Sequence, residues 1–366
     1  MQYTENQILN ALQTVHDPDL KKDLVSLGMI ENIKTEENKI SFSVVLTTPA
    51  CPMKSLIKQN CINAIHNLID TNANVEIEMT SRVTTRRSTT ESMLRNVKNI
   101  IAVASGKGGV GKSTVAANLA VALSKTGAKT GLLDADIYGP SVPLMFDLMN
   151  GHPSVVEENG KQIMIPLQKY GIKLLSIGFF VDPAKALLWR GPMASNALSQ
   201  LFHDSEWGEL DYLVVDMPPG TGDIHLTLVQ QVPVTGVCIV STPQEVALAD
   251  ARKALSMFTQ ENVNVPVLGL IENMSYFTPA ELPTNKYYIF GKEGGKRLAE
   301  ETGVPLLGQI PLVESICESG DNGNPIALDE SSATGIAFHT LAQNVARYVA
   351  IRNVSLPATK PVILQQ

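Results

Sequence analysis

Residues 106–114 of the chain read GKGGVGKST, which fits the G-x4-G-K-[ST] pattern of a phosphate-binding loop and adds a second lysine after the first glycine. Glycines let the backbone curl around phosphate oxygens with its N–H groups pointing inward, because a side chain would block that approach. Lys112 is expected to reach the β- and γ-phosphates, and the Ser113 hydroxyl to ligate Mg²⁺. We therefore predict a nucleoside triphosphate site that includes Gly106, Gly108, Gly109, Val110, Gly111, Lys112, Ser113 and Thr114.

The segments on either side of this loop agree with it. Val97 to Ser105 (VKNIIAVAS) is a short apolar run of strand character. Ser113 to Leu123 follows with apolar residues at helical spacing, which places Val115, Ala116, Leu119, Ala120 and Leu123 on one face. The loop alone could be a chance match in a glycine-rich stretch, but strand, loop and helix together are the context that the motif requires.

The composition is that of an ordinary globular protein with room for two domains. Of the 366 residues, 44% are hydrophobic and 18% are charged. The formal net charge of −7 argues against a nucleic-acid partner, because binding to a phosphate backbone needs a strongly basic face. Several basic residues do cluster, and we interpret them as part of a solvated linker. They are Arg82, Arg86, Arg87, Arg95 and Lys98.

The sequence also bears on membranes and on the redox compartment. No apolar run approaches the roughly 20 residues that a membrane-spanning helix needs. The first residues, MQYTENQILN, lack the basic and apolar regions of a signal peptide. The four cysteines are too few and too scattered for a disulfide framework, which fits a reducing compartment. We therefore expect a cytoplasmic protein with no membrane partner.

The chain divides into four segments. Residues 1–80 read as a small α/β unit, 81–96 as a polar linker, 97–350 as the phosphate-loop domain, and 351–366 as an extended or loosely packed tail. Short runs that are apolar on both faces recur along the third segment, which is typical of a parallel sheet covered by helices on either side. We predict an α/β fold with a doubly wound, mostly parallel sheet of the P-loop NTPase type, preceded by a small α/β domain.

The expected elements can be given by residue range. In the small unit they are helices over Asn6 to Val15 and Met53 to Ile69, with strands near Met29 to Lys34, Lys39 to Leu46 and Val75 to Met79. After the phosphate loop, the expected strands are Lys129 to Leu133, Ile172 to Ser176, Tyr212 to Val215, Val237 to Val240 and Val267 to Ile271.

Acidic residues follow two of these expected strands. Asp134 and Asp136 come after the first of them, and Asp216 ends the run Leu213-Val214-Val215. Ligands in a doubly wound sheet lie beyond the carboxyl ends of the strands. We therefore predict that Asp216 holds Mg²⁺ through water and that Asp136 orients the attacking water. A single carboxylate at a strand end can instead cap the following turn, but two beside a phosphate loop favour the metal and phosphate site.

Further stretches carry a family resemblance. They are LLDADIYGPS (132–141), LWRGPM (188–193), DYLVVDMPPGTGD (211–223) and IENMS (271–275). Together with the doubled-lysine loop, they are similar to the Mrp/ApbC family of iron–sulfur cluster carrier ATPases over about residues 97–350. That family has a deviant Walker A loop and belongs to the wider group of MinD, ParA and the nitrogenase iron protein.

The resemblance implies a mechanism. It implies an ATPase, with ATP and Mg²⁺ as cofactors, that is slow without a partner and works as a homodimer. Lys107 of each subunit would reach the phosphates bound by the other, although a lysine there could also be a solvated charge. The family pattern further suggests that Asn273 reads the adenine edge and that residues 308–311, ending in Pro311, close over the base. Residues 134–141 and 216–223 would be the two switch regions.

The N-terminal segment carries a second resemblance. DPDL (17–20), DLVSLGMI (23–30) and LTTPACPMK (46–54) are similar to a small metal–sulfur assembly domain that is often fused ahead of Mrp-type ATPases. Cys51 lies in a Pro-Ala-Cys-Pro turn just before a helix, where free N–H groups and the helix dipole are expected to lower its thiol pKa. It is the leading candidate iron–sulfur ligand; a small residue packed beside two prolines is the alternative. Cys61 and Cys238 read as core residues, and Cys317 is not assigned.

The sequence departs from the family at one place. Family members usually carry a Cys-x-x-Cys pair shortly after the Asn-Met-Ser stretch, whereas residues 276–291 of this chain contain no cysteine. The carboxylate of Glu281 is a poor substitute for thiolates at a soft iron–sulfur cluster. Either a cluster binds elsewhere, with Cys51 first among the candidates, or the protein supports assembly without holding a cluster between its ATPase domains.

Three functions follow from these readings. The first is an ATP-hydrolysing carrier or assembly factor that delivers iron–sulfur clusters to apoproteins, with those clients and other assembly factors as partners. The second is a nucleotide-gated scaffold that carries no metal, which the missing cysteine pair keeps open. The third is a positioning ATPase like ParA or MinD. It predicts a basic face or a C-terminal amphipathic membrane helix, and the sequence shows neither.

Overall fold

The structure is a computed structural model that describes residues 3–87, 94–158, 160–180, 191–279, 281, 282 and 284–362. The chain forms two compact units. Unit 1 comprises Met1–Thr85 with Ala346–Leu356, and unit 2 comprises Arg86–Val345 with Pro357–Gln366. The predicted stretch LWRGPM begins outside the described residues, which resume at Gly191.

Unit 1 is built on a three-stranded sheet with the strand order β1-β2-β3. Its elements are α1 (Glu5–Leu12), β1 (Ile30–Glu36), β2 (Lys39–Leu46), α2 (Lys54–Leu68) and β3 (Asn74–Ser81). β2 pairs antiparallel with β1 and parallel with β3. Alternate residues of β2, Ile40, Phe42 and Val44, are fully or almost fully buried in one core with side chains of α1 and α2, because successive strand residues point to opposite faces. The helix predicted to reach Val15 ends earlier, at Leu12.

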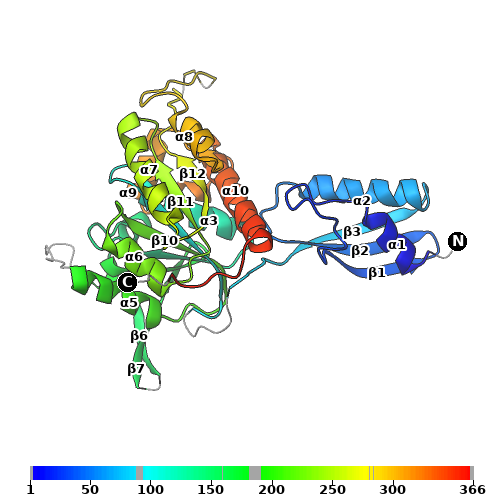
Figure 1. The fold of residues 1–366 in the computed structure, drawn as a ribbon, viewed down its shortest axis with the longest axis horizontal. Helices are drawn as coiled ribbons and strands as arrows, with labels where there is room; N and C mark the ends of the chain where they lie inside the picture. Colours follow the sequence, from blue (N-terminus) through cyan, green and yellow to red (C-terminus); the bar gives the residue numbers. More distant parts are fainter. Residues whose placement is uncertain are drawn as a thin grey trace. The chain divides into compact units, whose positions relative to one another are not determined.

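Unit 2 is built on an eight-stranded sheet with the order β13-β12-β11-β4-β10-β5-β9-β8. Figure 1 labels β10, β11 and β12 of this sheet. All neighbouring strands are parallel except β8, which is antiparallel to β9. The strands are β4 (Val97–Ser105), β5 (Thr130–Asp134), β8 (Leu167–Lys169), β9 (Ile172–Ser176), β10 (Leu210–Pro219), β11 (Gly236–Ser241), β12 (Val267–Glu272) and β13 (Leu306–Gln309). The predicted fold class, an α/β fold with a mostly parallel sheet and a small N-terminal α/β unit, is confirmed.

Helices cover both faces of this sheet. They are α3 (Lys112–Lys125), α4 (Val142–Met145), α5 (Gly191–His203), α6 (Asp223–Gln231), α7 (Glu245–Thr259), α8 (Gly294–Thr302), α9 (Glu314–Asp321) and α10 (Ala333–Ser355). On β4, Ile100, Ala102 and Ala104 join one core cluster with residues of α5, α6, α7 and α8. The strand residues between them face the side of α3, which contacts β4, β5 and β10. α3 is buried on more sides than the single face predicted, because the short 3₁₀ helix Ile326–Leu328 contacts it as well.

Several features were not predicted, among them the edge strands β8 and β13. A two-stranded hairpin, β6 (Ser154–Glu158) and β7 (Lys161–Ile165), projects from the rest of unit 2 and exposes Val155 and Val156 (Figure 1). β10 continues beyond Val215 to Pro219. The tail predicted to begin at residue 351 is wrong at its start, because α10 continues to Ser355. Most apolar residues of α10 from Phe338 to Ala350 are buried, and Arg352 and Asn353 are buried too. Pro357 follows shortly after the helix end.

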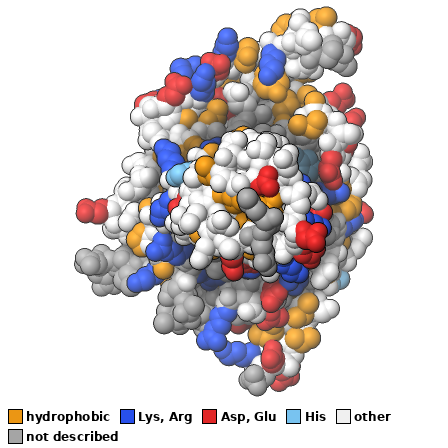
Figure 2. Space-filling model, turned by 90° about the vertical axis from the view of Figure 1, so that its right-hand side faces the viewer, with side chains coloured by type: hydrophobic (Ala, Val, Ile, Leu, Met, Phe, Trp, Pro, Cys, Tyr) orange, Lys and Arg blue, Asp and Glu red, His pale blue; other side chains and the backbone are white. Residues whose placement is uncertain are grey.

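The predicted basic linker is better paired than a solvated segment would be. In unit 1, Arg82 forms an ion pair with Glu31 at 3.1 Å, and in unit 2, Lys98 forms one with Asp211 at 2.8 Å. Arg87 donates to the carbonyl of Leu94 at 2.8 Å. On the face drawn in Figure 2, acidic and basic side chains of the described residues are interspersed. Among the helices that the structure describes, none is long and apolar enough to cross a bilayer.

Candidate nucleotide site

The predicted phosphate loop joins the carboxyl end of β4 to the first residue of α3, Lys112. Gly109 and Gly111 have φ angles of +81° and +79°, in the left-handed region that favours glycine. A Cβ atom at Gly111 would also lie 2.2 Å from Asn273 Nδ2. The loop therefore has both the backbone conformation and the close neighbour that exclude a side chain at this position.

Lys112 lies at the centre of a buried charge cluster. Its side chain is only 6% exposed, and its ammonium lies 2.5 Å from Asp216 Oδ1 and 3.5 Å from Asp136 Oδ2. It also donates to the Ser113 hydroxyl at 3.2 Å. Asp216 is fully buried, which raises the pKa of its carboxyl, and the Lys112 ammonium opposes that shift. The structure thus brings together Lys112, Asp136 and Asp216, three of the four predicted catalytic residues.

Asp134 is a fourth member of the cluster that the sequence placed in a switch region without a role of its own. It lies opposite Asp216 in the pairing of β5 with β10. Its carboxylate accepts hydrogen bonds from the backbone N–H groups of Asp136 at 3.1 Å and Val142 at 3.2 Å, and from the Ser176 hydroxyl at 2.9 Å. Burial, with Asp216 as a like charge, raises the pKa of Asp134 to about 7. Two acids around one alanine, Asp134-Ala135-Asp136, were the available signal for this role.

β10 extends further than its neighbour β5 at the carboxyl edge of the sheet. β5 stops at Asp134, paired with Asp216, while β10 continues through Met217 and Pro218 to Pro219, which lies opposite Ser105 of β4. Prolines have no N–H group to donate to a further strand. The Gly220 N–H then donates to the Ser105 carbonyl at 2.9 Å, so the second predicted switch region begins directly beside the phosphate loop.

The two predicted base-side residues lie on neighbouring segments. Asn273 follows the end of β12, is 5% exposed, and donates from Nδ2 to the Val110 carbonyl of the phosphate loop at 2.8 Å. Pro311 is buried and lies two residues after the end of β13. β12 and β13 are paired, so the structure brings Asn273, Pro311 and the phosphate loop to one edge of the sheet.

The remaining predicted loop residues differ in how far they are exposed to solvent. Val110 is buried, whereas Gly108 and Gly109 are exposed, and Gly106, Ser113 and Thr114 are partly exposed. Lys107 is also partly exposed. Within the described part of the chain, no side chain or backbone group makes a hydrogen bond or ion pair with its ammonium.

Two buried oxygens of the cluster fit a bound cation. Asp216 Oδ2 and Asp136 Oδ1 are inaccessible to solvent and have no hydrogen-bond partner among the described residues. Oxygen is the ligand that Mg²⁺ prefers, and unpartnered buried carboxylate oxygens are costly unless something binds them. No group of three or more His, Cys, Asp or Glu side chains that could hold a metal ion occurs in the described ranges.

The cysteines are scattered. Cys51 is partly buried in the loop before α2, and burial raises its thiol pKa, outweighing the Met53 backbone N–H that lowers it. The prediction of a lowered pKa at Cys51 is therefore wrong: α2 begins only at Lys54, and desolvation dominates. Cys61 and Cys238 are fully buried in α2 and β11, with pKa values raised to about 12. Cys317 is exposed on α9, where Asp321 raises its pKa.

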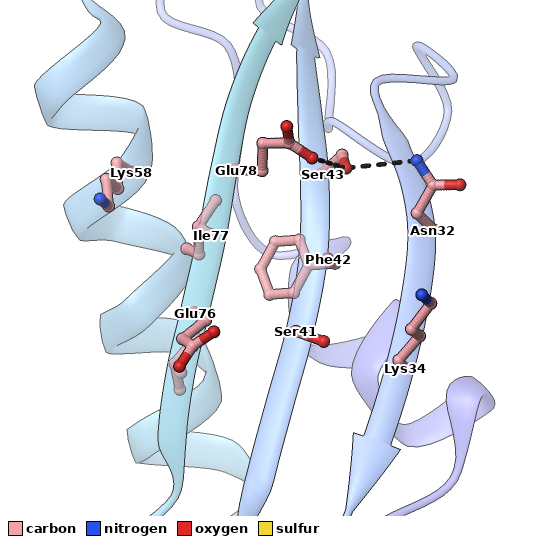
Figure 3. A pocket seen from close by; sticks show the side chains of 10 residues that line it. Asn32, Lys34, Ser41, Phe42, Ser43, Lys58, Glu76, Ile77 and Glu78 are labelled. Atoms are coloured by element: carbon pink, nitrogen blue, oxygen red, sulfur yellow. Dashed lines mark hydrogen bonds between the residues drawn. The ribbon is translucent and has the colours of Figure 1, made fainter.

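Unit 1 has a polar hollow on its sheet, shown in Figure 3, to which β1, β2 and β3 all contribute. Asn32 donates to the Ser43 hydroxyl at 3.3 Å, and Ser43 donates to Glu78 at 3.1 Å. Cys51 is not among the residues that line the hollow. These two hydrogen bonds join β1, β2 and β3 across the hollow, which is separate from the predicted cysteine site.

Comparison with known proteins decides the family. Residues 96–346 match the family described as the NUBPL iron-transfer P-loop NTPase. The chain belongs to this family. Residues 5–79 match a second family, described as iron–sulfur cluster assembly protein. The resemblance inferred from the phosphate loop and its companion motifs is thereby confirmed.

Relatives of this iron-transfer P-loop NTPase cover nearly its whole length. The iron–sulfur cluster carrier protein of Synechocystis is 46% identical over 350 residues, which are 95% of this chain and 98% of the relative. That of Deinococcus radiodurans is 44% identical, over 97% of this chain and 99% of the relative. A solved nucleotide-binding protein from Archaeoglobus fulgidus, in complex with ADP, has a TM-score of 0.55 and 38% identity, covering 64% of this chain and 90% of that one.

Proposed function

We propose that the protein binds and hydrolyses ATP with Mg²⁺ and uses this cycle as an iron–sulfur cluster carrier or assembly factor. The observation that carries the nucleotide part is the buried cluster of Lys112, Asp136 and Asp216 directly behind a glycine-rich loop. The cluster part rests on the two matched families and on relatives that are named iron–sulfur cluster carrier proteins.

The residues divide the work according to their position. The N–H groups of residues 106–111 would bind phosphate oxygens, and Lys112 would exchange Asp216 for the β- and γ-phosphates. Ser113 and Asp216, the latter through water, would hold Mg²⁺, which supplies neutralising charge to the phosphates. Asp136 is left to orient the attacking water. Asn273 and Pro311 would contact the adenine.

A homodimer would complete this site. The Lys107 ammonium has no partner among the described residues, although it belongs to the phosphate loop. An unpaired ammonium beside phosphates is suited to reach a nucleotide bound by a second copy of the chain. Hydrolysis would then depend on association of two chains, which keeps turnover slow until partners assemble.

The cargo and its clients are the less determined part of the proposal. We propose apo iron–sulfur proteins and assembly factors as partners, and the cytoplasm as the compartment. Cys51 stays the first candidate thiolate, despite its raised pKa, because it lies in the unit that matches the cluster assembly family. The absence of cysteine from residues 276–291 keeps the alternative of a nucleotide-gated scaffold open, but the names of the relatives do not favour it. A ParA- or MinD-like positioning role is not favoured by the names of the relatives.

Anaerobic reconstitution with iron and sulfide tests the cargo. A carrier should take up stoichiometric iron and develop thiolate-to-iron charge-transfer absorbance, and Cys51→Ser should lose both. Cys238→Ser is the matched control, since Cys238 is buried in β11 and should not affect loading. If no nucleotide condition yields bound iron, the carrier proposal is wrong and the scaffold stands. Nucleotide binding is measured separately by calorimetry, so the two parts can fail independently.

A further inference from the structure

Glu272, the last residue of β12, has a buried carboxylate that the proposed chemistry does not use. Its residue is only 1% exposed. Oε1 accepts hydrogen bonds from the Ser275 hydroxyl and, at 2.8 Å, from Gln309 Nε2. Oε2 accepts from the backbone N–H of Gly295. A buried carboxylate is costly unless its oxygens are satisfied, and here both oxygens have donors.

The donors come from three separate segments. Ser275 lies in the turn that follows β12, Gln309 ends β13, and Gly295 is the second residue of α8. Gly295 permits the approach, because a Cβ atom there would lie 2.9 Å from the Glu272 carboxylate. The positive end of the α8 dipole further favours a negative charge at this point. One carboxylate thus ties a turn, a neighbouring strand and a helix start together.

The turn after β12 needs such support. Met274 has a φ angle of +53°, in the left-handed region that a long side chain rarely adopts. Conformations of this kind persist only where the surroundings hold them, and they gather at ligand-binding segments. The hydrogen bond from Ser275 to Glu272 spans Met274 and closes the turn. Met274 also lies next to Asn273, the predicted reader of the adenine.

The same turn fixes the second base-side residue. The Ile310 N–H donates to the Glu272 carbonyl at 2.9 Å, and the Ser275 N–H donates to the Ile310 carbonyl at 2.9 Å. The Leu312 N–H donates to the Tyr276 carbonyl at 2.7 Å. Pro311 is therefore held between two residues that are bonded to the turn. A displacement of the turn would move Asn273 and Pro311 together.

The backbone of Asn273 and the phosphate loop are held by hydrogen bonds that do not involve the Glu272 carboxylate. Asn273 is fixed to the neighbouring strand by its own N–H, which donates to the Ser241 carbonyl at 2.8 Å. The phosphate loop is anchored by β4, α3 and the Lys112 cluster, none of which contacts the Glu272 carboxylate through a hydrogen bond in the described structure. The Glu272 carboxylate thus supports the turn that carries the base contacts, and it is linked to the phosphate loop indirectly, through Asn273, whose Nδ2 donates to the Val110 carbonyl at 2.8 Å.

We infer that Glu272 is a positioning residue that sets the base side of the nucleotide site, so that selectivity for adenine depends on its carboxylate. The inference rests on the proposed function, since it takes Asn273 and Pro311 as the base contacts. Glu272 acts through the turn and through these two residues and does not touch the nucleotide. A merely structural role would instead weaken binding of every phosphate ligand alike, because the whole domain would loosen.

The test compares ligands with and without a base on the full chain. Calorimetry with Mg²⁺ gives the dissociation constants of ATP, GTP and inorganic tripolyphosphate for the wild type, Glu272→Gln and Ser275→Ala. Gln keeps the size of the side chain but turns one acceptor into a donor. Glu301→Gln is the matched control. Glu301 lies on α8, the helix whose Gly295 donates to Glu272, and its carboxylate pairs with Arg252 at the surface. Circular dichroism establishes that each variant is folded.

We expect Glu272→Gln to weaken ATP by about tenfold to a hundredfold, the range set by one unsatisfied buried group, while tripolyphosphate changes less than about twofold. The preference for ATP over GTP should shrink. Ser275→Ala should act in the same direction but less, and it keeps the test open if Glu272→Gln does not fold. Equal losses for ATP and tripolyphosphate, or no loss for ATP, would overturn the inference. A wild type that binds tripolyphosphate without preferring ATP overturns it too, whereas one that binds neither ligand refutes the proposed function itself.

Discussion

The ammonium of Lys112 lies 2.5 Å from Asp216 Oδ1, inside a site where Asp216 is fully buried and Lys112 nearly so. The phosphates of a nucleotide therefore compete with a carboxylate for the same ammonium. At low effective dielectric such a pair is strong, and removing one partner leaves an uncompensated charge. Nucleotide binding as we propose it at this loop is thus an exchange of anions.

Asp216→Asn should tighten binding of ADP in the absence of Mg²⁺, because Lys112 loses its main competitor for phosphate. We expect roughly a tenfold gain, the equivalent of one charged hydrogen bond. ATP hydrolysis with Mg²⁺ should fall below detection, since the proposed metal ligand is lost. Calorimetry with EDTA and a phosphate-release assay measure the two effects. Asp211→Asn, which removes the Lys98 partner at the other end of β10, should change neither.

Gly111→Ala should abolish nucleotide binding, because the new Cβ would meet Asn273 Nδ2 at 2.2 Å and a φ of +79° disfavours alanine. Gly139→Ala in the first switch region is the control: nothing lies within 4 Å of a Cβ there. ATP binding of the two variants is compared by calorimetry. Wild-type affinity in Gly111→Ala would contradict the loop geometry described above.

Lys112→Ala and Lys107→Ala should differ in kind. Without Lys112 the phosphates lose their buried cation, so binding or turnover should disappear. Without Lys107 the binding site in one chain is intact, so binding should be largely kept while hydrolysis is lost. Equilibrium binding and phosphate release on the same preparations separate the two cases. Normal hydrolysis by Lys107→Ala would rule out the mechanism in which two subunits share each nucleotide.

Asp134 should give folding stability a dependence on pH. Its folded-state pKa of about 7 exceeds its ordinary value of 3.8, so between these values the folded protein holds a proton that the unfolded chain releases. The contribution of Asp134 to stability therefore falls as pH rises through this window and is constant above it. Asp134→Asn should reduce that slope. Denaturant unfolding at several pH values, followed by tryptophan fluorescence, tests this, with Glu158→Gln in the exposed strand β6 as control.

The thiols should alkylate in the order of their exposure and ionisation. Cys317 is exposed and should react first with iodoacetamide, although Asp321 raises its pKa. Cys51 should react slowly at pH 7 and faster at pH 9, because burial raises its pKa. Cys61 and Cys238 should react only after unfolding. Peptide mass spectrometry gives the extents, and rapid labelling of Cys51 at pH 7 would restore the hypothesis of an activated thiol.

The sequence predicted best what depends on short-range patterns. β2, β4 and β9 have the predicted bounds, because each is a run of strand-forming residues of strand length. The cluster of Lys112, Asp136 and Asp216 was predicted because the ends of parallel strands meet at one edge of a sheet. Asp134 and Glu272 were given no role, since what matters for both is which donors surround a buried carboxylate. That depends on strand register and not on local sequence.

Other failures have equally definite causes. The hairpin β6–β7 was missed because β6 is exposed throughout and β7 is only partly buried, so neither strand shows the period-two pattern of a half-buried strand. Cys51 was expected to be acidic from its place before a helix. The loop spaces it from the first residue of α2, and the apolar surroundings outweigh the dipole.

The pair Pro218-Pro219 has one more consequence. β10 passes the last residue of β5 by three residues, Met217, Pro218 and Pro219, and neither proline can donate a hydrogen bond to an added strand. At these two positions β10 offers no N–H group to a longer β5, so the β5–β10 pairing is not extended above Asp134 and Asp216. The backbone beside the proposed nucleotide site is thereby kept out of regular strand pairing with β5 by the covalent structure of proline.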